Sequence, residues 1–413
     1  MVNAIFPKKR GAGRRKQGAS NRDAEQNFSR EPFTAEVVDM ASDGRGVIHH
    51  PEGRTCFVSG VWLGEKGTFR LTDIKGRTGS AEVVELTQVA PQKVTAPCVY
   101  HGHSAKHCGG CAWQSIEYSA QLQAKQTRVE KALANLCKPD AIAPILGAEQ
   151  TEGYRNRAQF KTDGSKLGYV APSSNNIVDV ETCLVLTPHN AATLANLRQQ
   201  LPNSEWQPKR KEPWVTLNID ETHSADEVRV NERLPFMQAN SSQNKLMQDW
   251  LAERLARVDL ANPAIELFCG SGNFTEVIAA AGFPAVAAVE VVGDALSALQ
   301  AKALANVSVH GINLYEEGGL EKALKTQPKA KTLVLDPPRD GLKERAALLK
   351  KSCKIRDILY ISCDLATFTR DVTDLCGAGY KLVAVQPVDQ FPHTPHVEIL
   401  AHLRVKGGRN ANR

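Results

Sequence analysis

The spacing of hydrophobic and polar positions changes twice along this chain. In the N-terminal part, short runs of β-branched and aromatic residues alternate with glycine-containing turns. Such runs are typical of strands, and five in close succession predict a small β-barrel of the oligonucleotide-binding type. The five runs are 35–38, 46–48, 55–58, 67–72 and 81–86.

From about Asn244 onward, apolar strand-like runs alternate with helix-like runs. This alternation is typical of a doubly wound, Rossmann-like α/β domain. The predicted strands are 264–268, 285–290, 307–310, 332–335 and 357–361, the helices are 245–257, 274–281, 294–305 and 320–324, and a final β section covers 381–404. Between the two patterns lies a mixed α+β region with a helix at 121–136, strands within 154–180 and a helix end at 194–201.

Length and composition fit a multidomain protein of the cytoplasm. A chain of 413 residues is too long for one ordinary domain. No apolar run approaches the ~20 residues of a membrane helix, and the N-terminus lacks the apolar segment of a signal peptide. We therefore expect a cytoplasmic protein with no membrane partner.

Positive charge is concentrated at the N-terminus, although the net charge is only +6. A basic run among small polar residues predicts a disordered arm, which can also contact RNA phosphates. Its basic residues are Lys8, Lys9, Arg10, Arg14, Arg15 and Lys16, and a weaker basic group near the C-terminus is Lys406, Arg409 and Arg413.

A glycine turn at Gly270-Ser-Gly272 follows a predicted strand and opens a helix. Glycines there allow a ligand to approach the backbone closely. A dinucleotide enzyme would carry a third glycine where Thr275 stands. The next strand ends at Glu290, which suits a ribose diol, so the pattern favours an S-adenosylmethionine site of a class I methyltransferase.

The fourth strand of this domain ends in Asp336-Pro-Pro-Arg339. A carboxylate at the carboxyl end of a parallel strand lies at the active-site edge of an open sheet. Amino-methylating enzymes carry a similar segment that continues with an aromatic residue. Here Arg339 stands in that place, which favours methylation of carbon over nitrogen.

Cys363 and Glu398 supply the two groups that methylation of a pyrimidine carbon requires. Carbon 5 of uracil becomes nucleophilic only after a thiolate has added to carbon 6, and a base must then remove the proton from carbon 5. Cys363 ends an apolar strand, where its sulfur can face a cleft, and Glu398 lies downstream. His393 and His396 are nearby, and we assign them to packing.

Ten cysteines in a reducing compartment do not predict a disulfide framework. Cys108-Gly-Gly-Cys111 is spaced to wrap a metal, Cys98 precedes it by nine intervening residues, and Cys183 is distant. Zinc and an iron–sulfur cluster both fit this spacing. One of the three histidines between the first two cysteines is the alternative to Cys98 as a ligand. Tyr154-Arg-Asn-Arg157 suits stacking and phosphate contacts with single-stranded RNA.

Residues 33–404 resemble the TRAM-containing RNA (uracil-5-)-methyltransferases, especially their 23S ribosomal RNA branch. The barrel segment resembles the TRAM domain at Ser42–Val47, Phe57–Gly60 and Leu63–Glu65. The other matching motifs are Phe236–Asn240, Glu266–Thr275, Asp336–Arg339, Ser362–Asp371 and Asp389–Glu398.

The resemblance implies a role for each of these sites. Cys363 is the implied nucleophile and Glu398 the implied general base, while Asp336 lies between cofactor and uracil. The implied cofactor-binding residues are Gln238, Phe268, Asn273, Glu290, Asn313 and Asp336. The implied ligands of a [4Fe-4S] cluster are Cys98, Cys108, Cys111 and Cys183. The implied parts are a basic tail (1–30), a TRAM barrel (31–90), a middle RNA-binding domain with the cluster (91–235) and the methyltransferase domain (236–406).

Three other functions compete with methylation of 23S rRNA. Transfer RNA is the alternative substrate, but its enzymes usually lack both the barrel and the cysteine cluster. A cytosine-5 methyltransferase would carry a second cysteine in 336–341, where none occurs. A non-catalytic RNA-binding iron–sulfur protein would not be expected to keep Glu290, Asp336, Cys363 and Glu398 together. We expect an enzyme that acts on RNA as a monomer.

Overall fold

The structure is a computed structural model that describes residues 29–405. The predicted basic arm and the basic residues near the C-terminus lie outside the described residues. Two compact units are present: 29–41 with 45–91, and 42–44 with 92–405. Within the described part of the chain, no helix is long and apolar enough to cross a bilayer.

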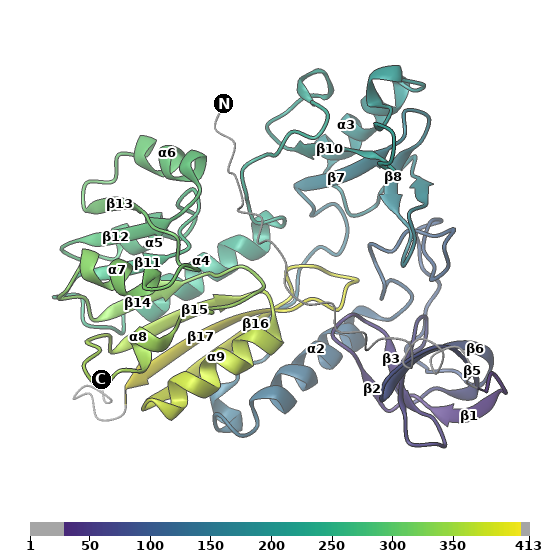
Figure 1. Cartoon of the computed structure of the whole chain (residues 1–413), viewed down its shortest axis with the longest axis horizontal. Coiled ribbons are helices and arrows are strands. Elements are labelled where there is room, and N and C mark those ends of the chain that lie inside the picture. The colour runs from purple at the N-terminus through teal and green to yellow at the C-terminus, as the bar shows by residue number, and fades with distance from the viewer. Residues whose placement is uncertain (1–28, 406–413) are drawn as a thin grey trace, which may run out of the picture. The chain divides into compact units, whose positions relative to one another are not determined.

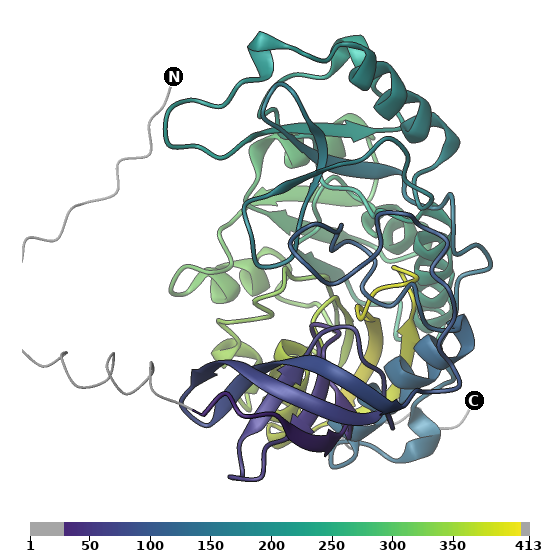
Figure 2. The same ribbon diagram turned by 90° about the vertical axis from the view of Figure 1, so that its right-hand side faces the viewer.

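The first unit, drawn in purple in Figure 2, is a six-stranded sheet. Its strand order is β1-β5-β6-β4-β3-β2. Its strands are β1 (Phe33–Glu36), β2 (Asp39–Met40), β3 (Gly46–His49), β4 (Thr55–Val58), β5 (Lys66–Lys75) and β6 (Thr78–Gln88). All neighbours are antiparallel except β4 and β6. Each of the five predicted runs overlaps one of these strands, because alternating apolar residues such as Phe69 and Leu71 are buried on one face.

In the second unit, a four-stranded antiparallel sheet has the order β10-β7-β8-β9. The strands are β7 (Arg157–Thr162), β8 (Leu167–Val170), β9 (Ile177–Asp179) and β10 (Val215–Asp220). Helix α3 (Pro188–Gln199) begins after Thr187, whose side chain accepts from the Asn190 N–H, a common N-cap arrangement. Leu194 of this helix shares one core with Phe160 and Leu217 of the sheet.

A seven-stranded sheet forms the C-terminal half of the same unit, with the order β13-β12-β11-β14-β15-β17-β16 (Figure 1). The strands are β11 (Ala264–Leu267), β12 (Val286–Glu290), β13 (Val307–Gly311), β14 (Thr332–Leu335), β15 (Asp357–Ser362), β16 (Tyr380–Val388) and β17 (Glu398–Val405). The first five are parallel, whereas β17 runs antiparallel to both β15 and β16. The strand order reverses between β11 and β14, so the predicted doubly wound α/β fold is confirmed.

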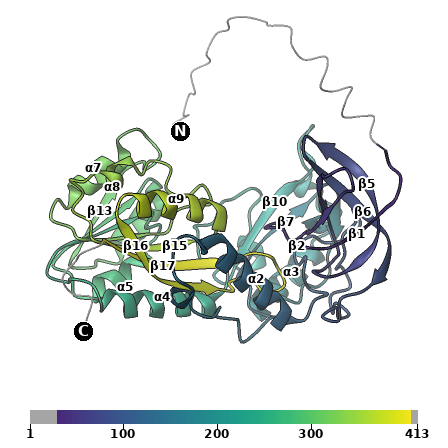
Figure 3. The same ribbon diagram turned by 90° about the horizontal axis from the view of Figure 1, so that it is seen from below.

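Helices cover both faces of this sheet, as Figure 3 shows. They are α2 (Tyr118–Leu133), α4 (Ser241–Leu255), α5 (Thr275–Ala280), α6 (Gly293–Ala301), α7 (Gly319–Thr326), α8 (Ala346–Leu349) and α9 (Leu365–Gly377), and the short 3₁₀ turns are Pro139–Ala141, Ser204–Trp206 and Ala225–Glu227. Ile358 and Tyr360 of β15 pack toward α7, α8 and α9, while Leu359 and Ile361 pack toward α4 and α5. The near-continuous apolar runs of the central strands follow from this two-sided burial.

Candidate active site

The predicted site residues of the α/β domain gather at one edge of the seven-stranded sheet. Phe268 and Asp336 directly follow the parallel strands β11 and β14, Glu290 ends β12, and Asn313 lies two residues beyond β13. The carboxyl ends of parallel strands meet at the same edge, and the switch point between β11 and β14 is where such sheets bind ligands.

Cys363 and Glu398 reach this edge from two different strands. Cys363 follows the last residue of β15, and Glu398 is the first residue of β17. Because β17 is antiparallel, its first residue lies at the edge where parallel β15 ends. Ser362 pairs with Ile399 across the two strands, which places Cys363 and Glu398 next to each other.

The glycine turn after β11 has the conformation that its sequence predicts. Gly270 and Gly272 have φ values of 52° and 96°, in the region that favours glycine. A Cβ at Gly272 would lie 2.6 Å from a methyl carbon of Leu299. Phe268 also has a positive φ of 61°, which is uncommon for an aromatic residue and typical of a functional turn.

The carboxylate of Glu290 is oriented by backbone donors. One oxygen accepts from the Gly270 N–H at 3.2 Å, and the other accepts from the N–H groups of Val291 and Val292 at 2.7 and 3.1 Å. The glycine turn and the end of β12 are thereby held together. An acidic group fixed beside such a turn is suited to bind a diol.

The remaining predicted cofactor residues differ in how far their side chains are already engaged. Asn273 exchanges two amide hydrogen bonds with Asn244 of α4, at 2.8 and 2.9 Å. Asn313 accepts from the Tyr315 N–H at 3.0 Å, and the Tyr315 ring lies 5.7 Å from that of Phe268.

Gln238 comes from the loop before α4 and joins the same region. Its side-chain oxygen accepts from Gln390 at 3.3 Å, and its backbone carbonyl accepts from Asn156 at 3.0 Å. The structure therefore brings Gln238 to the segment that precedes Glu398.

Three buried carboxyl groups lie near one another in the site: Glu398, Asp336 and Glu266. Burial, reinforced by the charge of Asp336, raises the pKa of Glu398 to about 8. Burial raises the pKa of Asp336 to about 7, and that of Glu266 to about 8 with a further contribution from Asp336. Glu266 was not anticipated as part of the site. It lies within β11, where an acidic residue in an otherwise apolar strand was the available sign.

Cys363 is a neutral thiol in these surroundings. Burial raises its pKa to about 12, and the charges of Glu398 and Asp336 act in the same direction. The guanidinium of Arg339 opposes them. Cys363 lines a pocket with Asp364, Arg128, Thr369 and His396.

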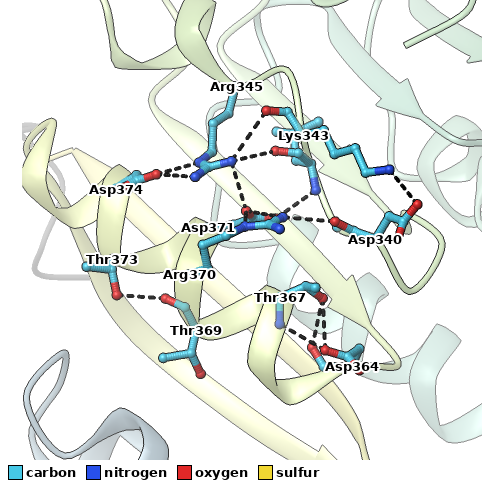
Figure 4. A network of polar contacts seen from close by, with 12 residues as sticks. Asp340, Lys343, Arg345, Asp364, Thr367, Thr369, Arg370, Asp371, Thr373 and Asp374 are labelled. Atoms are coloured by element: carbon cyan, nitrogen blue, oxygen red, sulfur yellow. Dashed lines mark hydrogen bonds and ion pairs between the residues drawn. The ribbon is translucent and has the colours of Figure 1, made fainter. Parts of the chain in front are cut away.

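A buried ionic network holds the loop that follows Asp336. The carboxylate of Asp371, fully buried on α9, accepts from the guanidinium groups of Arg370 and Arg345 (Figure 4). It also accepts from the Leu342 N–H and from the hydroxyl of Tyr360. The Thr367 hydroxyl also donates to the carbonyl of Arg339 at 2.9 Å. Together these bonds fix the loop from Asp336 to Leu342 against α9.

The segment before Glu398 is buried and has polar partners on α2. Lys125 and Asp389 form an ion pair at 2.5 Å, and both side chains are fully buried. This pair was not anticipated, because Lys125 looks like an ordinary solvent-facing residue of a helix. The sign in the sequence was the spacing of Gln121, Lys125 and Arg128, which lies on one helical face.

The two histidines near Glu398 lie in different surroundings. His393 is buried, and its backbone N–H donates to the side-chain oxygen of Gln121, in agreement with a packing role. His396 is half-buried, and burial lowers its pKa to about 4. The positive charge of Arg339 acts in the same direction. His396 is therefore neutral at physiological pH.

The motif Tyr154–Arg157 does not present its aromatic ring for stacking in this structure. Tyr154 is buried and donates to the carbonyl of Pro392, so the sequence-based prediction for this ring is wrong. Arg155 lies over the Phe391 ring at 5.6 Å. The motif supports the loop before Glu398 instead.

The four candidate metal-binding cysteines line one small cavity. Cys98, Cys108, Cys111 and Cys183 surround a space of about 30 Å³, and His101 also lines it. Burial raises the pKa of Cys108 to about 11 and that of Cys111 to about 12. Among residues 29–405, no three His, Cys, Asp or Glu side chains lie close enough to hold a single metal ion.

Comparison with known proteins matches this chain to RNA methyltransferases. The sequence model of the tRNA (uracil-5-)-methyltransferase family matches residues 216–406. An uncharacterized RNA methyltransferase of Nitrosomonas europaea is 39% identical over 384 residues, which cover 91% of this chain and 98% of that protein.

Two better-described proteins are also similar. The 23S rRNA (uracil(1939)-C(5))-methyltransferase RlmD of Pseudomonas putida is 29% identical over 440 residues, covering 89% of this chain and 92% of that protein. The crystal structure of the tRNA (uracil-54, C5)-methyltransferase of Pyrococcus abyssi, in complex with S-adenosyl-L-homocysteine, matches with a TM-score of 0.63 and 20% identity. The match covers 90% of this chain and 99% of the Pyrococcus abyssi chain, and it shows that the two proteins share a fold.

We expect Asp371→Ala to destabilise the protein far more than Asp374→Ala. Asp371 is fully buried, and its loss leaves Arg345 and Tyr360 without that partner, which costs about 3–5 kcal/mol in comparable cases. Asp374 also binds Arg345 but is 41% exposed, and such pairs contribute about 0–1 kcal/mol. Urea denaturation of both variants measures the difference, and equal free energies of unfolding would contradict this account.

Proposed function

This chain belongs to the RNA (uracil-5-)-methyltransferase family, and from that premise we propose that it transfers a methyl group from S-adenosylmethionine to carbon 5 of a uridine in 23S ribosomal RNA. The observation that carries the proposal is the juxtaposition of Cys363 and Glu398 across β15 and β17. A thiol and a carboxyl at neighbouring positions match the two groups that this reaction needs.

The proposed reaction divides the work between these two residues. The thiol of Cys363 loses its proton to water, its sulfur bonds to carbon 6 of uracil, and the electron pair of the 5,6 double bond makes carbon 5 nucleophilic. Carbon 5 then takes the methyl group from S-adenosylmethionine, whose sulfur keeps the electrons of the broken S–CH3 bond and leaves as S-adenosylhomocysteine. Glu398 accepts the proton from carbon 5, the C5–H electrons re-form the double bond, and the sulfur leaves carbon 6.

Electrostatics make Glu398 a stronger base than an ordinary carboxylate. Burial and Asp336 raise its pKa to about 8, so it holds an accepted proton near neutral pH. The same crowding disfavours a free Cys363 thiolate. A protonated Asp336, or the nearby Arg339, reduces that penalty, so we infer that the thiol loses its proton only once the site is filled.

We assign the methyl donor to the carboxyl ends of β11, β12 and β14, at the switch point of the sheet. The donor supplies a cationic sulfonium carrying the transferable methyl, which suits a site with three buried carboxyl groups. Glu290 is proposed to bind the ribose hydroxyls, and Phe268 to flank the adenine. The other proposed contacts are Gln238, Asn273, Asn313 and Asp336.

Two features of the chain support ribosomal RNA as the substrate. Relatives named as 23S rRNA enzymes align over 89% of this chain, including the region before the methyltransferase domain. The first unit, which we propose to be a TRAM-type RNA-binding barrel, and the cysteine cavity both lie in that region.

We propose that Cys98, Cys108, Cys111 and Cys183 hold a [4Fe-4S] cluster. Four cysteines that line one cavity are the ligand set that such a cluster requires. The Gly110 N–H already donates to the Cys108 sulfur at 3.4 Å, a contact that favours a thiolate. The cluster's role is structural, because this methyl transfer needs no electron.

Glu398→Gln is expected to separate the two halves of the reaction. An amide cannot accept the proton, so the variant should accumulate RNA that is methylated and still bonded to Cys363. General-base removal typically costs about 10²–10⁴-fold in rate. The measurement is a denaturation-resistant protein–RNA band formed with S-adenosylmethionine.

Cys363→Ala is the matched control for that experiment. It should eliminate the band and the methyl transfer, while leaving cofactor affinity within about threefold. Normal turnover by Glu398→Gln without a trapped species would assign the base to another group, and normal turnover by Cys363→Ala would contradict the covalent mechanism.

Cys111→Ser is expected to lower the content of iron and acid-labile sulfide in anaerobically purified protein. It should also weaken RNA binding more than cofactor binding, because the cysteine cavity lies outside the seven-stranded sheet. Cys353→Ser, which changes a half-buried cysteine away from the cavity, serves as the control. Zinc without iron or sulfide in the wild-type protein would show that the cluster assignment is wrong.

A further inference from the structure

The N-terminal half of helix α2 buries polar side chains, whereas Val129 and Leu133 in its C-terminal half belong to an apolar core. Tyr118, Gln121, Lys125 and Arg128 follow one another at intervals of three, four and three residues, so they lie on one side of the helix. Gln121 and Lys125 are fully buried. A helix that covers a protein core normally buries apolar residues at such positions.

Each of these side chains binds the loop between β16 and β17. Lys125 donates to Asp389 at 2.5 Å and to the carbonyl of Phe391 at 3.3 Å. The Tyr118 hydroxyl donates to the second oxygen of Asp389 at 2.8 Å. Both oxygens of this buried carboxylate therefore have a donor from α2.

The contacts continue along the loop toward Glu398. The Gln121 oxygen accepts from the His393 N–H at 2.9 Å, and Arg128 donates to the carbonyl of Pro395. Successive turns of α2 thus bind residues 389, 391, 393 and 395. His393 has a φ of 66°, a conformation that such contacts must hold in place.

Burying the Lys125–Asp389 ion pair costs free energy, so a contribution to stability does not by itself explain why the protein has it. Removing two charges from water is expensive, and an apolar pair of similar volume often stabilises a protein as well or better. Loops also usually lie at the surface, whereas Asp389 and Gln390 are fully buried. What the pair does provide is one fixed path for the chain immediately before β17.

We propose that the polar face of α2, with the Lys125–Asp389 ion pair at its centre, positions Glu398 for removal of the proton from carbon 5. This inference rests on the proposed function. Lys125 and Asp389 are positioning residues in this proposal, since both side chains are fully buried and their contacts lie within α2 and the loop. A displacement of about 1 Å in a reacting group can cost about 100-fold in rate.

The test compares two steps of a single turnover on 23S rRNA transcripts. Transcripts made with [5-³H]uridine release tritium when the base acts, and S-adenosylmethionine with a ¹⁴C-methyl group reports methyl transfer. For Lys125→Met we expect tritium release to slow by about 10- to 100-fold. Methyl transfer should change by less than about threefold, and the covalent adduct should accumulate.

Two variants serve as controls. Lys131→Met makes the same substitution at an exposed position in the last turn of α2 and should leave both rates unchanged. Lys125→Met combined with Asp389→Leu removes both charges and should recover most of the lost melting temperature, since no buried charge is left unpaired. Tritium release should nevertheless remain slow.

The outcomes separate the two proposals. If the wild-type enzyme forms no 5-methyluridine, the proposed function is wrong. If it does, but the two rates of Lys125→Met fall in parallel, or tritium release recovers with stability in the double variant, α2 has only a structural role. Tyr118→Phe, which removes one hydroxyl from the same carboxylate, gives the same comparison if Lys125→Met does not fold.

Discussion

The antiparallel pairing of β17 with β15 is the constraint on which the site depends. It brings Glu398, distant from Cys363 along the chain, to the neighbouring position at the same sheet edge. A slip of one residue in this register would turn Glu398 to the other face of the sheet. Two buried networks hold the segments that meet at this sheet edge. The Lys125–Asp389 pair holds the loop before β17, and the contacts of Asp371 hold the loop after Asp336.

The chemistry of the site follows from its buried carboxyl groups, whose negative charges have few positive groups nearby to balance them. Glu266, Asp336 and Glu398 have raised pKa values because they are buried, and for Glu266 and Glu398 because Asp336 lies near. The thiol of Cys363 is disfavoured as an anion for the same reasons. A site of this kind is best filled by a cation, which agrees with a sulfonium donor. In the proposed mechanism, the same surroundings keep the Cys363 thiol neutral until the reactants are in place.

Much of the fold could be predicted from the sequence, because the signals are local. The apolar strands β11, β12, β14 and β15 and the glycine turn carry their own patterns, and the strand ends then place Glu290, Asp336 and Cys363 at one edge. Strand β10 and helix α9 were not predicted. Val215–Asp220 mixes apolar and polar residues after a proline-containing loop, and α9 is rich in threonine, a weak helix former.

Tertiary burial accounts for what the sequence could not predict. Lys125 and Gln121 are polar residues of a helix, and only the packing of another loop against them shows that they are buried. The same holds for Tyr154, whose ring was expected to face RNA but binds Pro392. The four cysteines come from segments far apart in the chain and line one cavity, while their role as ligands stays a prediction.

The most direct test of the central claim is mass spectrometry of 5-methyluridine in separated ribosomal and transfer RNA after deletion of the gene for this chain. The account predicts that 23S rRNA loses 5-methyluridine at one or more positions. The wild-type gene should restore it, and the Cys363→Ala gene should not. Unchanged 23S rRNA, or a loss confined to transfer RNA or to 5-methylcytidine, would contradict the account.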